Sequence, residues 1–162
     1  MHDQTLERLH QLGLKLPNPP EPLGAYQATV EAGSMLYISM QGPVSAGTPA
    51  LMGLLGQEVS IEAGREAAKL SLLNALAHAF RYLGNLDRVK QVVRLDAYVA
   101  CGEVFISHPQ VIDSASELLV DIFAERAGHV RTVCGVRNLP GNLPVGLALI
   151  LELHPAELLL LK

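Results

Sequence analysis

Alternating apolar and polar residues predict β-strands in several parts of the chain, because neighbouring side chains of a strand point to opposite faces. Gly33-Ser34 separates the first two segments and is compatible with a type II′ turn, so we expect a hairpin there. The predicted strands are Ala25–Ala32, Met35–Met40, Val89–Ala100, Arg131–Val136 and Val145–Leu153. One face of the longest is predicted to carry Val89, Gln91, Val93, Leu95, Ala97 and Val99.

Apolar residues spaced three or four apart predict helices between these strands. One begins after the N-cap residue Ser60 and continues to Leu83, and Gly84 is a natural residue to end it. Another begins at Ser107, before Pro109, and ends near Gly128. Between hairpin and helix, the glycine-rich stretch Gly42–Gly56 is predicted to be a loop.

The N-terminal residues 1–23 are predicted to form a short helix followed by an extended segment. Asp3 can cap the helix, and Leu6 and Leu9 lie at helical spacing. The segment Leu16–Leu23 contains several prolines, which exclude a helix or an inner strand.

The last predicted strand, Val145–Leu153, is apolar on both faces. Leucines and valine occupy one face, whereas Gly146, Ala148 and Ile150 keep the other almost free of charge. Two helices can cover only one side of the sheet, so the other side requires a partner subunit. The order of elements predicts an α+β fold with helices on one face of the sheet and an oligomeric protein.

Length and composition narrow the class of protein. The chain has 162 residues, 49% of them hydrophobic and 17% charged, which predicts one folded domain over residues 1–162. A net charge of −4 argues against a nucleic-acid partner. We expect a cytoplasmic protein without a membrane span or signal peptide, since its apolar runs are short and Cys101 and Cys134 form no disulfide framework.

Known sequence motifs for phosphate binding, serine nucleophiles and zinc are absent, so we expect no metal and no cofactor. Cys101, His108, His129 and Cys134 could meet in space, but their spacing matches no common zinc pattern. We interpret them as a buried cysteine pair and surface histidines. Cys101 has no basic neighbour in the sequence and is not expected to act as a nucleophile.

Arg131 is the strongest candidate for ligand binding. It lies where a predicted strand leaves a helix, and its guanidinium could hold a carboxylate through two parallel hydrogen bonds. The alternative is a solvated arginine at the end of a strand.

Several segments together resemble the YjgF/Rid family, whose members are also labelled L-PSP endoribonuclease-like. The resemblance covers roughly residues 12–153, and its longer-chain subgroup shares the Leu-Pro-x-Pro-Pro-x-Pro segment. The segments that carry it are Leu16–Tyr26, Leu36–Pro43, Gly84–Val89, Val111–Leu119 and Arg131–Pro140.

This resemblance implies a chorismate-mutase-like fold (bacillary type), with two helices packed on one sheet face and an extra N-terminal helix. It also implies a homotrimer with inward-facing sheets and clefts between subunits that bind small 2-imino or 2-keto acids. Characterised members are imine deaminases, hydrolases that convert reactive imines or enamines to keto acids and ammonia. The family's arginine matches Arg131, its pocket tyrosine Tyr26, and its Ser-Gly-Gln strand end Ser39, Met40 and Gln41.

The chain departs from the family pattern at positions that matter for catalysis. Gly146 replaces the acidic residue that would position the attacking water, and Met40 replaces a glycine in the cleft. Asp113-Ser114 stands where the subgroup usually has Asn-Gly. Glu152, Glu103 or Asp113 could replace the missing acid only through a geometry that the sequence does not reveal.

Three functions therefore stay open. In the first, Arg131 holds the carboxylate of an imino acid while backbone groups near Ser39 and Val133 orient the imine and the water. In the second, the protein is a catalytically weak or inactive trimer that binds a carboxylate ligand or a partner. The third is the family's ribonuclease or translation-inhibitor label, which the acidic charge disfavours. Tyr26 either lines the pocket or belongs to the apolar face of its strand, and Ser39 and Gln41 could simply satisfy backbone groups.

Overall fold

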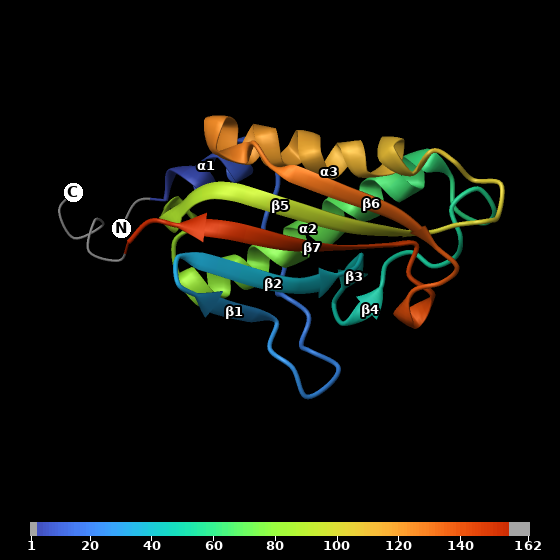
Figure 1. The fold of residues 1–162 in the computed structure, drawn as a ribbon, viewed down its shortest axis with the longest axis horizontal. Helices are drawn as coiled ribbons and strands as arrows, with labels where there is room; N and C mark the ends of the chain where they lie inside the picture. Colours follow the sequence, from blue (N-terminus) through green and yellow to red (C-terminus); the bar gives the residue numbers. More distant parts are fainter. Residues whose placement is uncertain (1–2, 156–162) are drawn as a thin grey trace.

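The computed structural model describes residues 3–155, which form a five-stranded sheet with helices on one face (Figure 1). The strand order is β1-β2-β7-β5-β6, in which β5 and β6 are parallel and the other neighbours antiparallel. The strands of this sheet are β1 (Thr29–Ala32), β2 (Met35–Gln41), β5 (Val89–Ala100), β6 (Val130–Val136) and β7 (Val145–Leu153). The helices are α1 (Gln4–Gln11), α2 (Ile61–Leu83) and α3 (His108–Phe123), with 3₁₀ turns at Leu86–Arg88, Ala124–Ala127 and Pro140–Asn142.

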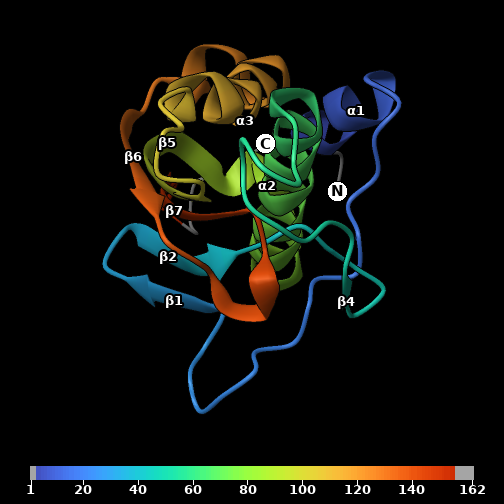
Figure 2. The same cartoon turned by 90° about the vertical axis from the view of Figure 1, so that its right-hand side faces the viewer.

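The hydrophobic core lies between the sheet and the pair α2 and α3 (Figure 2). The predicted ends of α2 are confirmed: the Ser60 hydroxyl accepts a hydrogen bond from the Ala63 N–H, and Gly84 ends the helix with φ 70°. Every second residue of β7 is buried against the helices, as its sequence predicts. The α+β class with helices on one face is therefore confirmed. No helix among residues 3–155 is long and apolar enough to cross a membrane.

The hairpin forms at the predicted turn, but its first strand is shorter than predicted. Ala32 pairs with Met35 across Gly33-Ser34, and Gly33 has φ 62°, as a type II′ turn requires. β1 begins only at Thr29, so Tyr26 is not part of a strand and the predicted strand Ala25–Ala32 is wrong in its first half. β1 pairs on one side only, and the chain before it turns back within Gly24–Tyr26.

β5 does not keep the strict alternation that its sequence predicts. The register against β7 shifts between Val89 and Gln91 and again between Val92 and Arg94. These irregularities place Val92 in the core, in place of Gln91 and Val93, which are only partly buried. From Leu95 onward the predicted alternation holds.

The predicted loop Gly42–Gly56 also contains regular structure. β3 (Val44–Ser45) and β4 (Thr48–Pro49) pair as a small ribbon apart from the main sheet. Asn74 of α2 anchors this segment, since its side-chain amide donates to the carbonyls of Gly42 and Val44 at 2.9 Å. Such short strands carry no clear alternation, which is why the sequence pattern misses them.

Two aspartates, Asp3 at the start of α1 and Asp87 in the turn Leu86–Arg88, hold α1 to the rest of the chain. Each accepts hydrogen bonds from N–H groups of the other's segment. Asp3 accepts from the N–H of Leu6 in its own helix and from the N–H of Leu86. Asp87 accepts from the N–H groups of Gln4 and Thr5 and from the Thr5 hydroxyl. Burial raises the pKa of Asp87, but these hydrogen bonds and Arg126 outweigh it and lower the pKa overall.

Asp87→Asn should therefore weaken the attachment of α1. We expect the free energy of unfolding near neutral pH to fall by about 1–3 kcal/mol, because charged acceptors make the stronger hydrogen bonds. Because the pKa of Asp87 is lowered in the folded protein, its contribution is complete above the unfolded value of about 3.9 and is lost as the pH falls through the folded value. The difference in the free energy of unfolding between wild type and variant, measured by urea unfolding, should become smaller below about pH 4. Glu66→Gln, at an exposed ion pair, is the control and should change little.

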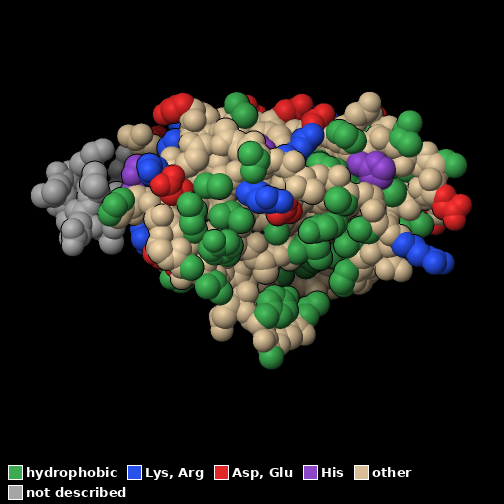
Figure 3. Space-filling model, in the orientation of Figure 1, with side chains coloured by type: hydrophobic (Ala, Val, Ile, Leu, Met, Phe, Trp, Pro, Cys, Tyr) green, Lys and Arg blue, Asp and Glu red, His purple; other side chains and the backbone are tan. Residues whose placement is uncertain are grey.

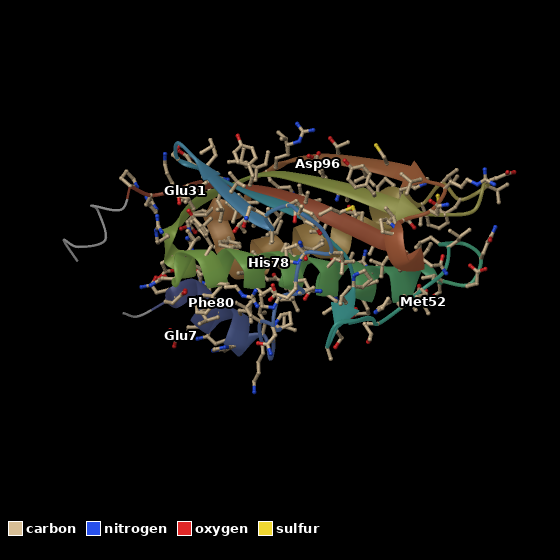
Figure 4. All side chains as sticks on the ribbon, turned by 90° about the horizontal axis from the view of Figure 1, so that it is seen from below. Glu7, Glu31, Met52, His78, Phe80 and Asp96 are labelled. Carbon is tan, nitrogen blue, oxygen red and sulfur yellow. The ribbon has the colours of Figure 1, made fainter. Side chains whose placement is uncertain are left out.

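Among residues 3–155, no helix covers the other face of the sheet (Figure 1). Figure 3 shows hydrophobic side chains gathered on this face. The side chains of this face are mostly apolar, and several large ones are exposed to solvent. In the middle, Arg94 holds Asp96 through its Nε at 2.8 and 2.9 Å, and this contact lowers the pKa of Asp96. Figure 4 shows Asp96 on the side of the sheet away from α2. We call this the open face; its residues include Val30, Tyr37, Met40, Tyr98, Val130, Gly146, Ala148 and Ile150.

Candidate functional site

Arg131 does not extend into solvent but is held against α3. Its Nη1 donates to the Asp113 carboxylate at 2.8 Å and to the Ser116 hydroxyl at 3.2 Å. The β6 strand carries Arg131 on its helix-facing side, opposite Leu95 of the core. Asp113 and Ser116 are three residues apart on α3, so they share the helix face that lies over this edge of the sheet.

His129 holds the Ser116 hydroxyl that Arg131 contacts. His129 Nδ1 lies 2.6 Å from the carbonyl oxygen of Ala127, which can only accept, so Nδ1 carries the proton. In the neutral imidazole, His129 Nε2 is then an acceptor, and it accepts a hydrogen bond from the Ser116 hydroxyl at 3.1 Å. Hydrogen bonds thus run in one direction from Arg131 through Ser116 and His129 to Ala127.

The guanidinium keeps binding capacity after these contacts. Within residues 3–155, neither Nε nor Nη2 of Arg131 has a hydrogen-bond partner. The ion pair with Asp113 is partly exposed, with 45% of the Asp113 side chain accessible, and such pairs contribute only about 0.2–1 kcal/mol. A carboxylate that makes two charge-assisted hydrogen bonds gains more than this, so Asp113 does not block the arginine.

Met40 and Gly146 form a complementary pair on the open face. A Cβ atom on Gly146 would lie 2.7 Å from the Met40 sulfur, so Met40 fills the space that a side chain at position 146 would need. The register of β2 against β7 shifts between Ile38 and Gln41, and Ser39 and Met40 lie in this irregular stretch. Gln41 is buried and donates to the carbonyl and the hydroxyl of Ser39 at 3.2 Å.

One copy of the chain does not bring the predicted site residues together. Arg131 and Val133 are on the helix side of β6, whereas Gly146 and Met40 are on the open face. Tyr26 stands before β1 and is exposed, and its hydroxyl accepts only a long hydrogen bond from the Leu23 N–H at 3.4 Å. The helix-side partners Ser116 and His129 were missed by sequence reasoning, although the helical spacing of Asp113 and Ser116 could have indicated them.

A cavity lies elsewhere in the described part of the chain, at the ends of β5 and β6. It has a volume of about 900 Å³, and Cys101 and His108 are in its wall. Cys101 Sγ is 3.2 Å from His108 Nε2, and Cys134 is exposed. The interpretation as a buried cysteine pair is therefore wrong, and Cys101 has a basic neighbour, His108, the first residue of α3.

His78, which is not among the four residues of that interpretation, is buried. His78 is 4% exposed, on the side of α2 that the proline-rich segment covers. Burial and the nearby Arg81 lower its pKa. Figure 4 shows His78 on α2, remote from Asp96 on the open face. No group of three or more potential metal ligands occurs among the residues that the structure describes, and His2 lies outside them.

Comparison with known families assigns the chain. The family described as "YjgF/chorismate_mutase-like, putative endoribonuclease" matches residues 6–153. The chain belongs to this family. Protein TCP17 of Trypanosoma cruzi is 33% identical over 147 residues, which are 90% of this chain and 92% of TCP17.

Solved structures with the same fold agree with this assignment. A Shewanella oneidensis protein whose crystal structure carries the endoribonuclease description has a TM-score of 0.89 and 34% identity, covering 92% of this chain and 99% of that one. The Agrobacterium tumefaciens protein Atu1372 has a TM-score of 0.87 and 32% identity, covering 93% of this chain and 92% of its own. Escherichia coli TdcF has the same fold at 17% identity, with a TM-score of 0.60 over 85% of this chain and 94% of TdcF.

Proposed function

We propose that this YjgF-family protein binds small carboxylate metabolites, 2-imino or 2-keto acids, in clefts between the subunits of a homotrimer. The observation that carries the proposal is the free edge of Arg131, whose Nε and Nη2 have no partner within the described part of the chain. An arginine whose Nη1 is fixed by Asp113 and Ser116 presents this edge in one orientation, which suits a planar carboxylate.

The proposed cleft needs two copies of the chain. β6 is an edge strand, and the open face is largely apolar apart from the charged pairs Arg94–Asp96 and Lys90–Glu152. Covering the open face with other copies would remove exposed Val30, Tyr37 and Val130 from water. It would also allow Arg131 of one copy to approach Met40 and Gly146 of another. The TdcF structure, which shares the fold, holds bound serine, a small molecule with a carboxylate.

Imine hydrolysis in this protein should be weak. Position 146 carries no carboxylate to polarise water, and Met40 occupies the space beside it. Asp113, which could have replaced the missing acid, is paired with Arg131 and thus serves the binding group. Met40 supports the second function, a ligand-binding trimer with little turnover, over an efficient deaminase. The unpaired thiols fit a reducing compartment such as the cytoplasm.

The decisive experiment is Arg131→Ala, measured by calorimetry with small 2-keto acids. We expect affinity to fall by roughly 10-fold or more while the trimer stays intact, since charge-assisted hydrogen bonds are worth about 1.5–3 kcal/mol. Arg131→Lys should recover little of the loss, because an ammonium cannot make the two parallel contacts. Equal affinity in wild type and Arg131→Ala would contradict the proposed site.

Asp113→Asn tests whether Asp113 competes with the ligand. The amide oxygen of the new Asn can still accept from Nη1, but the repulsive negative charge beside the ligand is gone, so we expect binding of 2-keto acids to tighten by about 2- to 5-fold, as an exposed ion pair of up to 1 kcal/mol implies. Glu117→Gln removes a charge one turn further along α3, where Glu117 pairs with Arg65, and should have no such effect. Weaker binding in Asp113→Asn would mean that Asp113 positions Arg131 more than it competes.

A further inference from the structure

A second candidate site lies in the cavity at the ends of β5 and β6, apart from Arg131. These are the only parallel neighbours in the sheet as described, so their carboxyl ends point the same way and meet the first residue of α3. Cys101 follows β5, and His108 begins α3. The cavity of about 900 Å³ between them is also lined by Phe105, Glu103 and Arg137.

The thiol and the imidazole are placed to exchange a proton. Cys101 Sγ lies 3.2 Å from His108 Nε2, and the rings of Phe105 and His108 pack in a T-shaped arrangement with centroids 5.2 Å apart. Gly135 makes this approach possible, because a Cβ there would lie 2.3 Å from His108 Nε2 and 3.2 Å from the sulfur. Both side chains are only partly buried, so a molecule in the cavity can reach them.

We propose that Cys101 and His108 form a nucleophilic site in which the thiol adds to small carbon electrophiles that carry a negative charge. His108 Nε2 accepts the thiol proton as the sulfur electron pair forms the new S–C bond. With an α,β-unsaturated acid, the electrons of the C=C bond move to the neighbouring carbon. That carbon then takes the proton back from His108, and the product is a thioether.

The preference for an anion rests on the surrounding charges. Arg137 lines the cavity, the amino end of the 16-residue α3 faces it, and His108 becomes cationic during the reaction. Glu103 is the single opposing charge in the wall. Burial raises the pKa of the Cys101 thiol, so without His108 this cysteine should react more slowly than an ordinary thiol at neutral pH.

Alkylation of full-length Cys134→Ser protein, in which Cys101 is the remaining thiol, tests the site. We expect iodoacetate to modify Cys101 at pH 7 about 10-fold faster than N-acetylcysteine, and faster than iodoacetamide does. His108→Gln should slow Cys101 at least about 10-fold, which is the low end of general-base effects. Mass spectrometry measures each rate, and thermal unfolding checks that the variant is folded.

The pH dependence keeps the test decisive if His108→Gln does not fold. With His108 as the base, alkylation of Cys101 should already be fast at pH 7, well below the range in which a thiol ionises without help. A rate that rises only where a buried thiol titrates, above about pH 8.5, would overturn the proposal. A rate at or below that of N-acetylcysteine would overturn it as well, and equal rates with the two reagents would overturn the preference for anions. None of these outcomes bears on Arg131.

Discussion

Restoring the acid at position 146 should raise imine hydrolysis by about 100-fold, provided that Met40 is removed as well. A general base contributes typically 10²–10⁴-fold, and the wild type lacks one at this position. In Gly146→Glu alone, the new Cβ would lie 2.7 Å from the Met40 sulfur, so the two side chains compete for one space. Met40→Gly opens that space. The rate increase in the double variant should therefore be larger than the product of the rate increases in the two single variants.

The control for this experiment is Gly146→Gln combined with Met40→Gly, which has the same shape but no base. The assay follows an imine that an amino-acid oxidase generates in place, measured against its spontaneous hydrolysis. We expect the wild type to be about 100-fold slower than family members that carry the glutamate. A wild type as fast as those members would show that another group positions the water. Equal gains from Glu and Gln would show that space, and not basicity, is limiting.

The sequence predicts the frame of this fold because its strongest patterns are local. α2 has a capping serine, a continuous apolar stripe and a terminal glycine. Each of these signals depends only on residues that are close to it in the sequence. β7 is equally secure, since its alternation continues over Val145–Leu153 without interruption. Errors occur where pairing with another strand decides the outcome, as with the register shifts in β5 and the late start of β1.

The chemistry was harder to predict, because its partners come from separate elements. Arg131 was identified from its place at a strand, but its contacts Asp113 and Ser116 come from α3. Cys101 has no basic neighbour along the chain, yet His108 approaches it across a turn. Spacing in the sequence carries no distance between a strand and the helix that follows it, so such pairs emerge only from the fold.

The proposed assembly can be tested with two neighbouring residues of β7 that face opposite ways. Leu149 is 1% exposed in the core, beside Leu95 and Ile38, whereas Ile150 is on the open face beside Tyr37 and Arg94. Leu149→Asp buries a charge without a partner, which costs several kcal/mol, so we expect insoluble protein. Ile150→Asp should fold, because Arg94 lies opposite, but should not assemble, because the charge would be buried between copies.

Sedimentation and circular dichroism separate these outcomes. For Ile150→Asp we expect the mass of a single chain with the wild-type far-ultraviolet spectrum, while the wild type sediments as three copies. A folded monomer would identify the open face as the contact surface, and its loss of 2-keto acid binding would then indicate that the Arg131 site needs two copies. An Ile150→Asp protein that still forms trimers would contradict the proposed arrangement. In that case the copies would contact one another through a different surface. Val30, Tyr37 and Val130 would then stay exposed to water in the assembly, although exposed apolar patches usually mark a contact surface.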